Sequence, residues 1–282
     1  MGVDEKALGQ RLQKARQKAG LTQQELCQKA GLSYSTLAKI ERGAIKSPSV
    51  FTVAAIAIAT NTSVEKLLNM KELATTTSAK KTSKTGVKFV YFDLNRTLVR
   101  NYERAFTVIA QKVGMSADKI EAIYWRYNAS ANNGELSREQ FNKIMSEQLG
   151  LADFNWSKYY VEFVEPMPGM KELVSWAAEY YSVGILSGTM PGLIDDLLIA
   201  GKLPKVHYAK IIDSSQVKLL KNAPKIFELA QTEAGVAPDQ LLLVDDDTQA
   251  LTIAGELDWQ ISRFNQYDPQ ESITRVREHL AF

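Results

Sequence analysis

The sequence predicts two domains: an all-α bundle in residues 1–73, and an α/β domain with a parallel sheet and an inserted helical cap in residues 87–282. Three observations support this. The chain has 282 residues, enough for two domains of ~150 residues each. Apolar residues recur with helical spacing in the first part, whereas short apolar runs alternate with helical stretches in the second. Residues 74–86 (ATTTSAKKTSKTG) contain no large apolar side chain, so we expect a flexible basic linker there.

Capping residues and glycines divide the first domain into five expected helices. Gly20 ends the first helix, and Thr22 with Glu25 forms a capping box at the start of the second. Gly31 makes a tight turn, and Ser33 caps the third helix. The expected helices are residues 7–19, 23–30, 34–41, 48–59 and 64–73.

The second and third of these helices, joined by a short glycine turn, make a helix-turn-helix. In such a motif one helix fits the DNA major groove while its partner crosses the backbone. The run LTQQELCQKAGLSYSTLAKIERG (residues 21–43) carries Thr-Gln-x-Glu-Leu, the turn glycine, and Ile-Glu-x-Gly. It resembles the Cro/repressor-like, or XRE-type, helix-turn-helix family, and the resemblance covers roughly residues 6–73.

This resemblance implies a double-stranded DNA operator as partner. It also implies a homodimer, because such modules usually bind two half-sites about one helical turn apart. Base edges would be read by Tyr34, Ser35 and Lys39, which lie near one helix face. The residues implied to hold backbone phosphates are Gln23, Ser33, Arg42 and Lys46. Cys27, in the second helix, is interpreted as a small buried hydrophobe rather than a redox sensor.

The distribution of charge favours a nucleic-acid partner for the first part of the chain only. Residues 1–86 carry 14 Lys and Arg against 6 Asp and Glu, whereas residues 87–282 carry 20 against 26. A basic surface favours contact with phosphates. Three alternatives stay open: chance clustering of surface lysines, a linker that itself touches phosphates, and a helical bundle that binds another protein.

Four short apolar runs in the second domain are typical of buried parallel strands. They are residues 87–92, 183–186, 206–212 and 241–244. Three of the four end at or next to Asp or Ser, and open α/β sheets bind ligands outside the carboxyl ends of their strands. About 90 residues separate the first two runs, far more than a crossover needs, so we expect a helical cap at about residues 100–165.

Asp93, a carboxylate at the tip of the first run, is followed by a tight loop and Thr97, which suits phosphoryl chemistry in which Mg²⁺ bridges an anion to carboxylates. The segment KFVYFDLNRTLV (residues 88–99) resembles the first motif, Asp-x-Asp-x-Thr, of the haloacid dehalogenase-like (HAD) superfamily. Ser187 matches the second motif, Lys221 in KNAPKIF the third, and LLLVDDD (residues 241–247) the fourth. The resemblance covers roughly residues 87–282 and implies a Rossmann-like α/β fold with a helical cap.

The resemblance also implies roles for individual residues. Asp93 would be the nucleophile and a Mg²⁺ ligand, Ser187 would hydrogen-bond the phosphoryl group, and Lys221 would neutralise charge beside Asp93. Lys218 is the alternative lysine, but Lys221 fits the Pro-Lys-Ile-Phe spacing better. The implied catalytic positions are Asp93, Asn95, Ser187 and Lys221, and the implied metal ligands are Asp93, Asn95, Asp245 and Asp246.

Asn95 departs from the family pattern, which has a second aspartate at this position. In the family that aspartate protonates the leaving group and then activates water, and an amide can do neither. Loss of a general acid/base costs about 10²–10⁴-fold in rate. In the family, the metal contact at this position is made by a backbone carbonyl, which survives the change. We therefore expect a site that binds Mg²⁺ and an anion but turns over poorly.

These observations together predict a DNA-binding transcriptional regulator. Its HAD-like domain would serve dimerisation, or sensing of a phosphorylated small-molecule effector, or both. The alternatives are a slow phospho-aspartyl site and an ordinary Mg²⁺-dependent phosphatase that the helix-turn-helix localises to DNA.

One cysteine excludes an internal disulfide framework, and two histidines disfavour a His-based metal centre. No apolar run of ~18 residues and no apolar leader is found, so we expect a soluble, cytoplasmic protein without a membrane partner.

Overall fold

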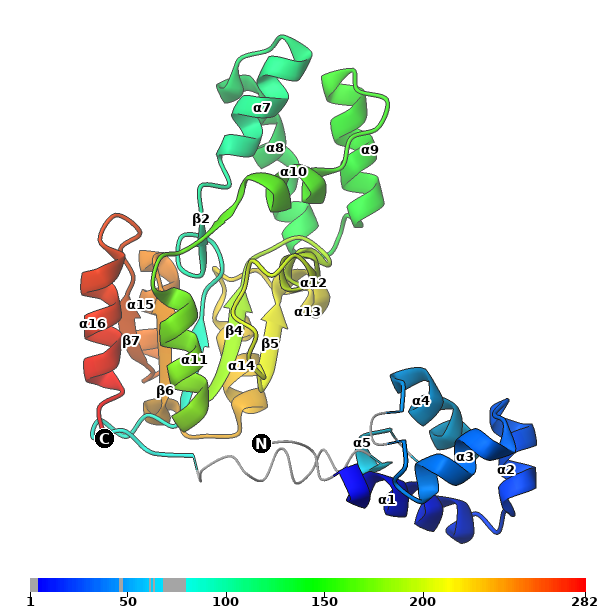
Figure 1. The fold of residues 1–282 in the computed structure, drawn as a ribbon. Helices are drawn as coiled ribbons and strands as arrows, with labels where there is room; N and C mark the ends of the chain where they lie inside the picture. The colour runs from blue at the N-terminus through cyan, green and yellow to red at the C-terminus, as the bar shows by residue number, and fades with distance from the viewer. Residues whose placement is uncertain (1–4, 46–47, 61, 63, 68–79) are drawn as a thin grey trace. The chain divides into compact units, whose positions relative to one another are not determined.

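The computed structural model divides the chain into two compact units, Met1–Ser78 and Ala79–Phe282. It describes residues 5–45, 48–60, 62, 64–67 and 80–282 (Figure 1). Within these residues no helix is both long enough and apolar enough to cross a membrane.

The first unit consists of helices, as the sequence predicts. They are α1 (Glu5–Lys18), α2 (Gln23–Ala30), α3 (Tyr34–Glu41), α4 (Val50–Ala59) and α5 (Val64–Leu67). The bounds of α2 and α3 match the prediction because their caps are local: Thr22 and Glu25 form the capping box, and the Ser33 hydroxyl accepts from the Thr36 amide. Gly31 takes a φ of 66° between them, which favours glycine. The last residues of the expected fifth helix, 68–73, lie outside the described residues.

Leucine and isoleucine side chains from α1 to α4 form one core in this unit. Leu12, Leu26, Leu37 and Ile56 have no exposed surface, and Cys27 is buried beside them, as predicted. Their alignment on the inner faces of the helices follows from the helical spacing of apolar residues in the sequence.

The core of the first unit also holds a buried ion pair. Arg16 of α1 donates from Nε to Glu41 Oε1 (2.7 Å) and from Nη2 to Glu41 Oε2 (3.0 Å), and its Nη1 donates to the Leu21 carbonyl (2.9 Å). The hydrogen bond to Glu41 raises the pKa of Arg16 above its usual value. The pair ties α1 to the end of α3 in a place where either charge alone would be unpaired.

A five-stranded parallel sheet forms the centre of the second unit. The strands are β1 (Phe89–Phe92), β4 (Ser182–Ser187), β5 (Lys210–Asp213), β6 (Leu241–Asp245) and β7 (Gln260–Arg263), in the order β5-β4-β1-β6-β7. Phe92 at the end of β1 lies level with Ile185 of β4 and Val244 of β6. The four predicted strands are present, although the third begins only at Lys210, and β7 was not predicted because its residues do not form an apolar run.

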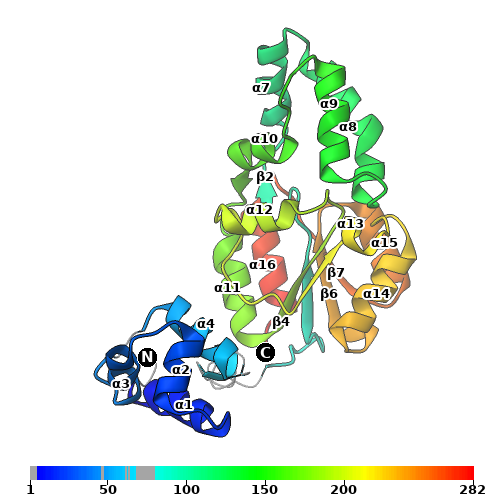
Figure 2. The same ribbon diagram turned by 90° about the vertical axis from the view of Figure 1, so that its right-hand side faces the viewer.

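Helices cover both faces of this sheet (Figures 1 and 2). On one face lie α11 (Met170–Tyr180), α12 (Leu193–Ile199) and α16 (Pro269–His279). On the other lie α14 (Pro224–Ala234) and α15 (Thr248–Glu256), and the short α13 (Ser214–Val217) and η1 (Pro238–Gln240) lie in connections. Apolar residues on both faces of the strands are therefore buried, which explains their continuous apolar runs.

Four helices inserted between β1 and β4 form the cap, which stands beyond the carboxyl ends of the strands (Figure 1). They are α7 (Arg104–Val113), α8 (Ala117–Asn132), α9 (Arg138–Leu149) and α10 (Trp156–Phe163). The connections into and out of the cap pair as two short antiparallel strands, β2 (Val99–Arg100) and β3 (Glu165–Pro166). The cap has an aromatic core in which Phe106, Tyr124 and Trp156 contact one another.

The second half of the expected linker differs from the prediction. Residues 80–86 lie against the second unit, where the Lys81 amide donates to the Tyr180 carbonyl (2.6 Å) and the Lys84 amide to the Ala281 carbonyl (2.7 Å). A segment without large apolar residues is held here by backbone hydrogen bonds, which composition does not reveal. The first half of the expected linker lies outside the described residues.

Candidate functional site

The carboxyl ends of three neighbouring strands bring the predicted site residues together. Asp93 follows β1, Ser187 ends β4 and Asp245 ends β6, and β1 lies between the other two strands. The Asp93 amide donates to the Val244 carbonyl (3.0 Å), which fixes the start of the loop. All three side chains are buried.

Lys221, in the loop before α14, is the lysine at this site. Its ammonium pairs with Asp93 Oδ1 and lies 2.5 Å from Asp245 Oδ2. Lys218, the alternative from the sequence, is exposed at the end of α13 in a left-handed conformation (φ 57°). Lys221 therefore links two strand ends that are more than 150 residues apart in sequence order.

Burial and crowding perturb the carboxyl groups of the site. Burial disfavours the charged form of Asp93 and, together with Asp245, raises the pKa of Asp93 to about 8 despite Lys221. Burial and the Asp245 charge likewise raise the pKa of Asp246 to about 6. Burial works against the Lys221 ammonium, but the carboxylates of Asp245 and Asp93 outweigh it and raise the pKa of Lys221.

The donor set fits a hard divalent cation and an anion. Carboxylate oxygens of Asp93, Asp245 and Asp246 lie within 4.8 Å of one another, and such oxygens are the ligands that Mg²⁺ prefers. The hydroxyls of Thr97 and Ser187 are buried and have no hydrogen-bond partner among the described residues. Buried polar groups are rarely left without a partner, and a hydroxyl can donate to an oxyanion.

Asn95 is held by the cap. The hydroxyl of Tyr160 in α10 donates to Asn95 Oδ1, and Tyr160 itself is buried. The side-chain amide of Asn95 cannot release a proton at neutral pH.

Comparisons with known proteins agree with the two units. The helix-turn-helix family model HTH_3 matches residues 12–67. A HAD-family enzyme from Bacteroides thetaiotaomicron, an aspartate-to-alanine mutant crystallised with magnesium and inorganic phosphate, is 17% identical with a TM-score of 0.56, over 64% of this chain and 95% of that chain. A predicted HAD-like hydrolase from Porphyromonas gingivalis is 20% identical with a TM-score of 0.56, over 68% and 98%. The second unit has a HAD-like fold. No curated protein matches the chain in sequence.

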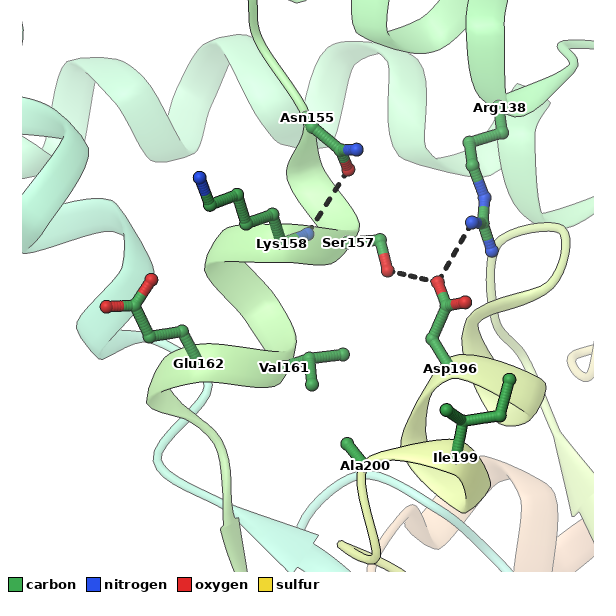
Figure 3. A pocket seen from close by; sticks show the side chains of 9 residues that line it. All are labelled: Arg138, Asn155, Ser157, Lys158, Val161, Glu162, Asp196, Ile199 and Ala200. Atoms are coloured by element: carbon green, nitrogen blue, oxygen red, sulfur yellow. Dashed lines mark hydrogen bonds and ion pairs between the residues drawn. The ribbon is translucent and has the colours of Figure 1, made fainter.

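One hollow of the HAD-like domain lies away from the strand ends. It has a volume of about 470 Å³ and is lined by cap helices α9 and α10 and by α12 (Figure 3). At its edge Asp196 accepts from the Ser157 hydroxyl and pairs with Arg138 (2.9 Å), and Arg138 Nε donates to the Pro191 carbonyl (2.9 Å). These contacts tie the cap to the sheet domain, and the hollow contains none of the residues expected to bind phosphate or metal.

In the helix-turn-helix region, the residues expected to read bases lie on the exposed face of α3. Tyr34 is 55% exposed, and Ser35 and Lys39 are exposed as well. Their exposure on one helix leaves them free to contact a partner.

The residues expected on phosphates divide into three cases. Gln23 Nε2 donates to Glu41 Oε2 (2.7 Å), and its contact with a phosphate stays a prediction. Ser33 uses its hydroxyl to cap α3, and exposed Arg42 donates from Nε to the Ala38 carbonyl (3.1 Å). Lys46 lies outside the described residues.

Sequence reasoning did not assign a role to Tyr160. Nothing in the sequence links this residue to Asn95, which lies 65 positions earlier. Thr97 carried a signal, since it occupies the threonine position of the first motif, but its role was not assigned.

Proposed function

We propose that this chain is a DNA-binding regulator in which residues 1–73 bind an operator and the HAD-like domain, residues 87–282, binds a phosphorylated small molecule with Mg²⁺. Ligand binding in the HAD-like site then regulates DNA binding by residues 1–73. A homodimer would present two recognition helices to two half-sites.

The observation that carries the proposal is the combination of a retained binding site with an amide at position 95. The Lys221 ammonium beside Asp93, and the hydroxyls of Thr97 and Ser187 that have no partner among the described residues, support the binding of an anion. Asn95, whose oxygen accepts from Tyr160, supplies no proton to a leaving group. A site that can hold a ligand but lacks its acid suits sensing better than turnover.

Asp93, Asp245 and Asp246 would hold Mg²⁺, which when bound would neutralise charge on the phosphoryl oxygens. Lys221 would neutralise negative charge between Asp93 and the anion, and the Ser187 hydroxyl would donate a hydrogen bond to a phosphoryl oxygen. The Bacteroides structure with magnesium and phosphate supports this choice of ligands by its fold.

A turnover assay tests the impaired site. The full chain is incubated with Mg²⁺ and a generic phosphomonoester, and we expect hydrolysis about 10²–10⁴-fold below ordinary phosphatase rates because the general acid is missing. Ordinary turnover by the wild type that is lost in Asp93→Asn would contradict the proposal. It would support the second candidate, a phosphatase localised to DNA, which the retained Asp93–Lys221 arrangement favours.

Metal binding should depend on pH. Carboxylates must be deprotonated to bind Mg²⁺. The raised pKa values of Asp246 (about 6) and Asp93 (about 8) mean that protons compete with the metal below these values. We therefore expect Mg²⁺ affinity, measured by titration calorimetry, to rise between about pH 6 and pH 8. Asp245→Asn should abolish binding, whereas Glu147→Gln, an exposed cap acid, serves as control. A pH-independent affinity would contradict the assignment.

DNA binding should depend on salt and on the exposed face of α3. Affinity for an operator fragment selected by the protein should fall steeply with salt, because each neutralised phosphate contributes a slope of about −0.9. Tyr34→Ala should reduce the preference for operator over random DNA about tenfold, which is typical of one lost base contact. Lys158→Ala, an exposed lysine of the cap, is the matched control. If Tyr34→Ala and Lys39→Ala both bind like the wild type, α3 is not the recognition helix.

A further inference from the structure

A small cavity adjoins the phosphate-binding residues of the HAD-like domain. Its volume is about 120 Å³. Asn95, two residues after Asp93, and Gly188, directly after Ser187, line it on the side of the strand ends. Cap helices α8 and α10 and the loop before α12 contribute the remaining walls. A molecule whose phosphoryl group lies at Asp93 has this cavity beside it for its organic part.

The cavity has no formal charge. Its eleven lining residues include no Asp, Glu, Lys, Arg or His. A second ionic group on a ligand would lose its water here without gaining a partner, which is costly. The cavity therefore selects against ligands that carry a carboxylate or an ammonium next to the phosphate.

Polar side chains of the cavity form a chain of hydrogen bonds that ends in an unused acceptor. Asn128 Nδ2 donates to Tyr124 Oη (2.7 Å), and Asn132 Nδ2 donates to Asn128 Oδ1 (2.9 Å). Asn132 Oδ1 is buried and has no partner among the described residues. Opposite the cap, Thr189 is 2% exposed and its hydroxyl, too, has no partner in the described part of the chain.

Unpartnered groups that are buried this deeply point to a ligand that completes them. The Asn132 oxygen requires a donor, and the Thr189 hydroxyl can both donate and accept. An alcohol hydroxyl, which also does both, meets these needs without carrying charge. The rings of Tyr102 and Trp125 add apolar surface against the carbon skeleton of a ligand.

We infer that the ligand of the HAD-like site is the phosphate monoester of a small uncharged polyol or sugar, whose hydroxyls bind Asn132 and Thr189. This inference rests on the proposed function, because it takes the phosphoryl group to lie at Asp93. It adds the chemical class of the organic part.

Binding of four matched compounds tests the inference. Inorganic phosphate, glycerol 1-phosphate, 3-phosphoglycerate and phosphoethanolamine are titrated into the full chain with Mg²⁺ by calorimetry. We expect glycerol 1-phosphate to bind about tenfold or more tightly than each of the other three, because it alone adds hydroxyls without adding charge. Equal or tighter binding of the carboxylate or ammonium compound overturns the inference.

Two variants connect that preference to the cavity. Thr189→Val keeps the shape of the side chain and removes a hydroxyl that has no hydrogen bond among the described residues, so the fold should persist. Asn132→Leu removes the unused acceptor. Each variant should lower the ratio of glycerol phosphate to inorganic phosphate affinity by about threefold to tenfold, the usual worth of one hydrogen bond. Glu147→Gln is the control for the cap.

The outcomes separate this inference from the proposed function. Tight phosphate binding without a preference for the polyol overturns the inference and leaves the phosphate site intact. An unchanged ratio in Thr189→Val, with wild-type thermal stability, also overturns it. Absence of binding by all four compounds in the wild type overturns both.

Discussion

Replacement of Asn95 by aspartate should raise the phosphomonoesterase turnover of the full chain by about 10²–10⁴-fold, the usual contribution of a general acid/base. The rest of the site is present: Lys221 pairs with Asp93, and Asp245 and Asp246 are close enough to share a cation. Under the proposed function, the site lacks only a group that can give and take a proton beside the phosphoryl group. A steady-state assay of Asn95→Asp with Mg²⁺ measures the gain directly.

Tyr160 influences this experiment because its hydroxyl donates to the oxygen at position 95. A hydrogen bond to a carboxylate stabilises the charged form and lowers the pKa of the group, so that less of it is protonated at a given pH. We therefore expect Asn95→Asp/Tyr160→Phe to shift the pH–rate profile of Asn95→Asp toward higher pH.

Two controls decide what the gain means. Asp93→Asn/Asn95→Asp should be inactive, because the carboxylate that we expect to be the nucleophile is gone. An Asn95→Asp protein that binds phosphate with Mg²⁺ but gains no turnover would refute the claim that the missing acid limits this site.

Loss of the Glu41 carboxylate should destabilise the helix-turn-helix region by about 3–5 kcal/mol, the cost of leaving one buried charge unpaired. Arg16 and Glu41 side chains are 10% and 2% exposed, so water cannot replace the lost partner. A helical unit of this size has about 3–5 kcal/mol of stability to lose. In Glu41→Ala we expect the first unit to unfold at room temperature and DNA binding to disappear with it.

Urea denaturation of the full chain, followed by circular dichroism, measures this effect. The double variant Arg16→Met/Glu41→Leu should recover most of the stability, because it removes both charges and fills the space with apolar atoms. Glu25→Gln, which keeps an acceptor for the Thr22 amide, is the matched control. A Glu41→Ala curve that overlays the wild type would show that the pair contributes nothing.

Local signals in the sequence predicted local structure well. The capping box at Thr22 and the cap at Ser33 set the bounds of α2 and α3, since a cap acts within three residues of itself. Continuous apolar runs predicted β1, β4 and β6, because parallel strands are buried on both faces.

Elements that depend on distant partners were predicted less well. β7 has alternating burial and lies at the edge of the sheet, so its residues show no apolar run. Residues 80–86 have the composition of a linker, yet backbone hydrogen bonds hold them to Tyr180 and Ala281. The hydrogen bond from Gln23 to the buried carboxylate of Glu41, 18 positions later, had no signal in the sequence.

The sequence by itself determined the order of the two units and placed Asp93, Ser187 and Asp245 at one edge of a sheet, because parallel strands all end there. Only the tertiary structure decided that the Lys221 ammonium contacts both Asp93 and Asp245, that Tyr160 holds Asn95, and that an uncharged cavity adjoins Asn95. The reason is physical. Strand ends and caps follow from neighbouring residues, whereas contacts between cap and sheet bring together residues far apart in the chain, whose pairing depends on the packing of the whole domain.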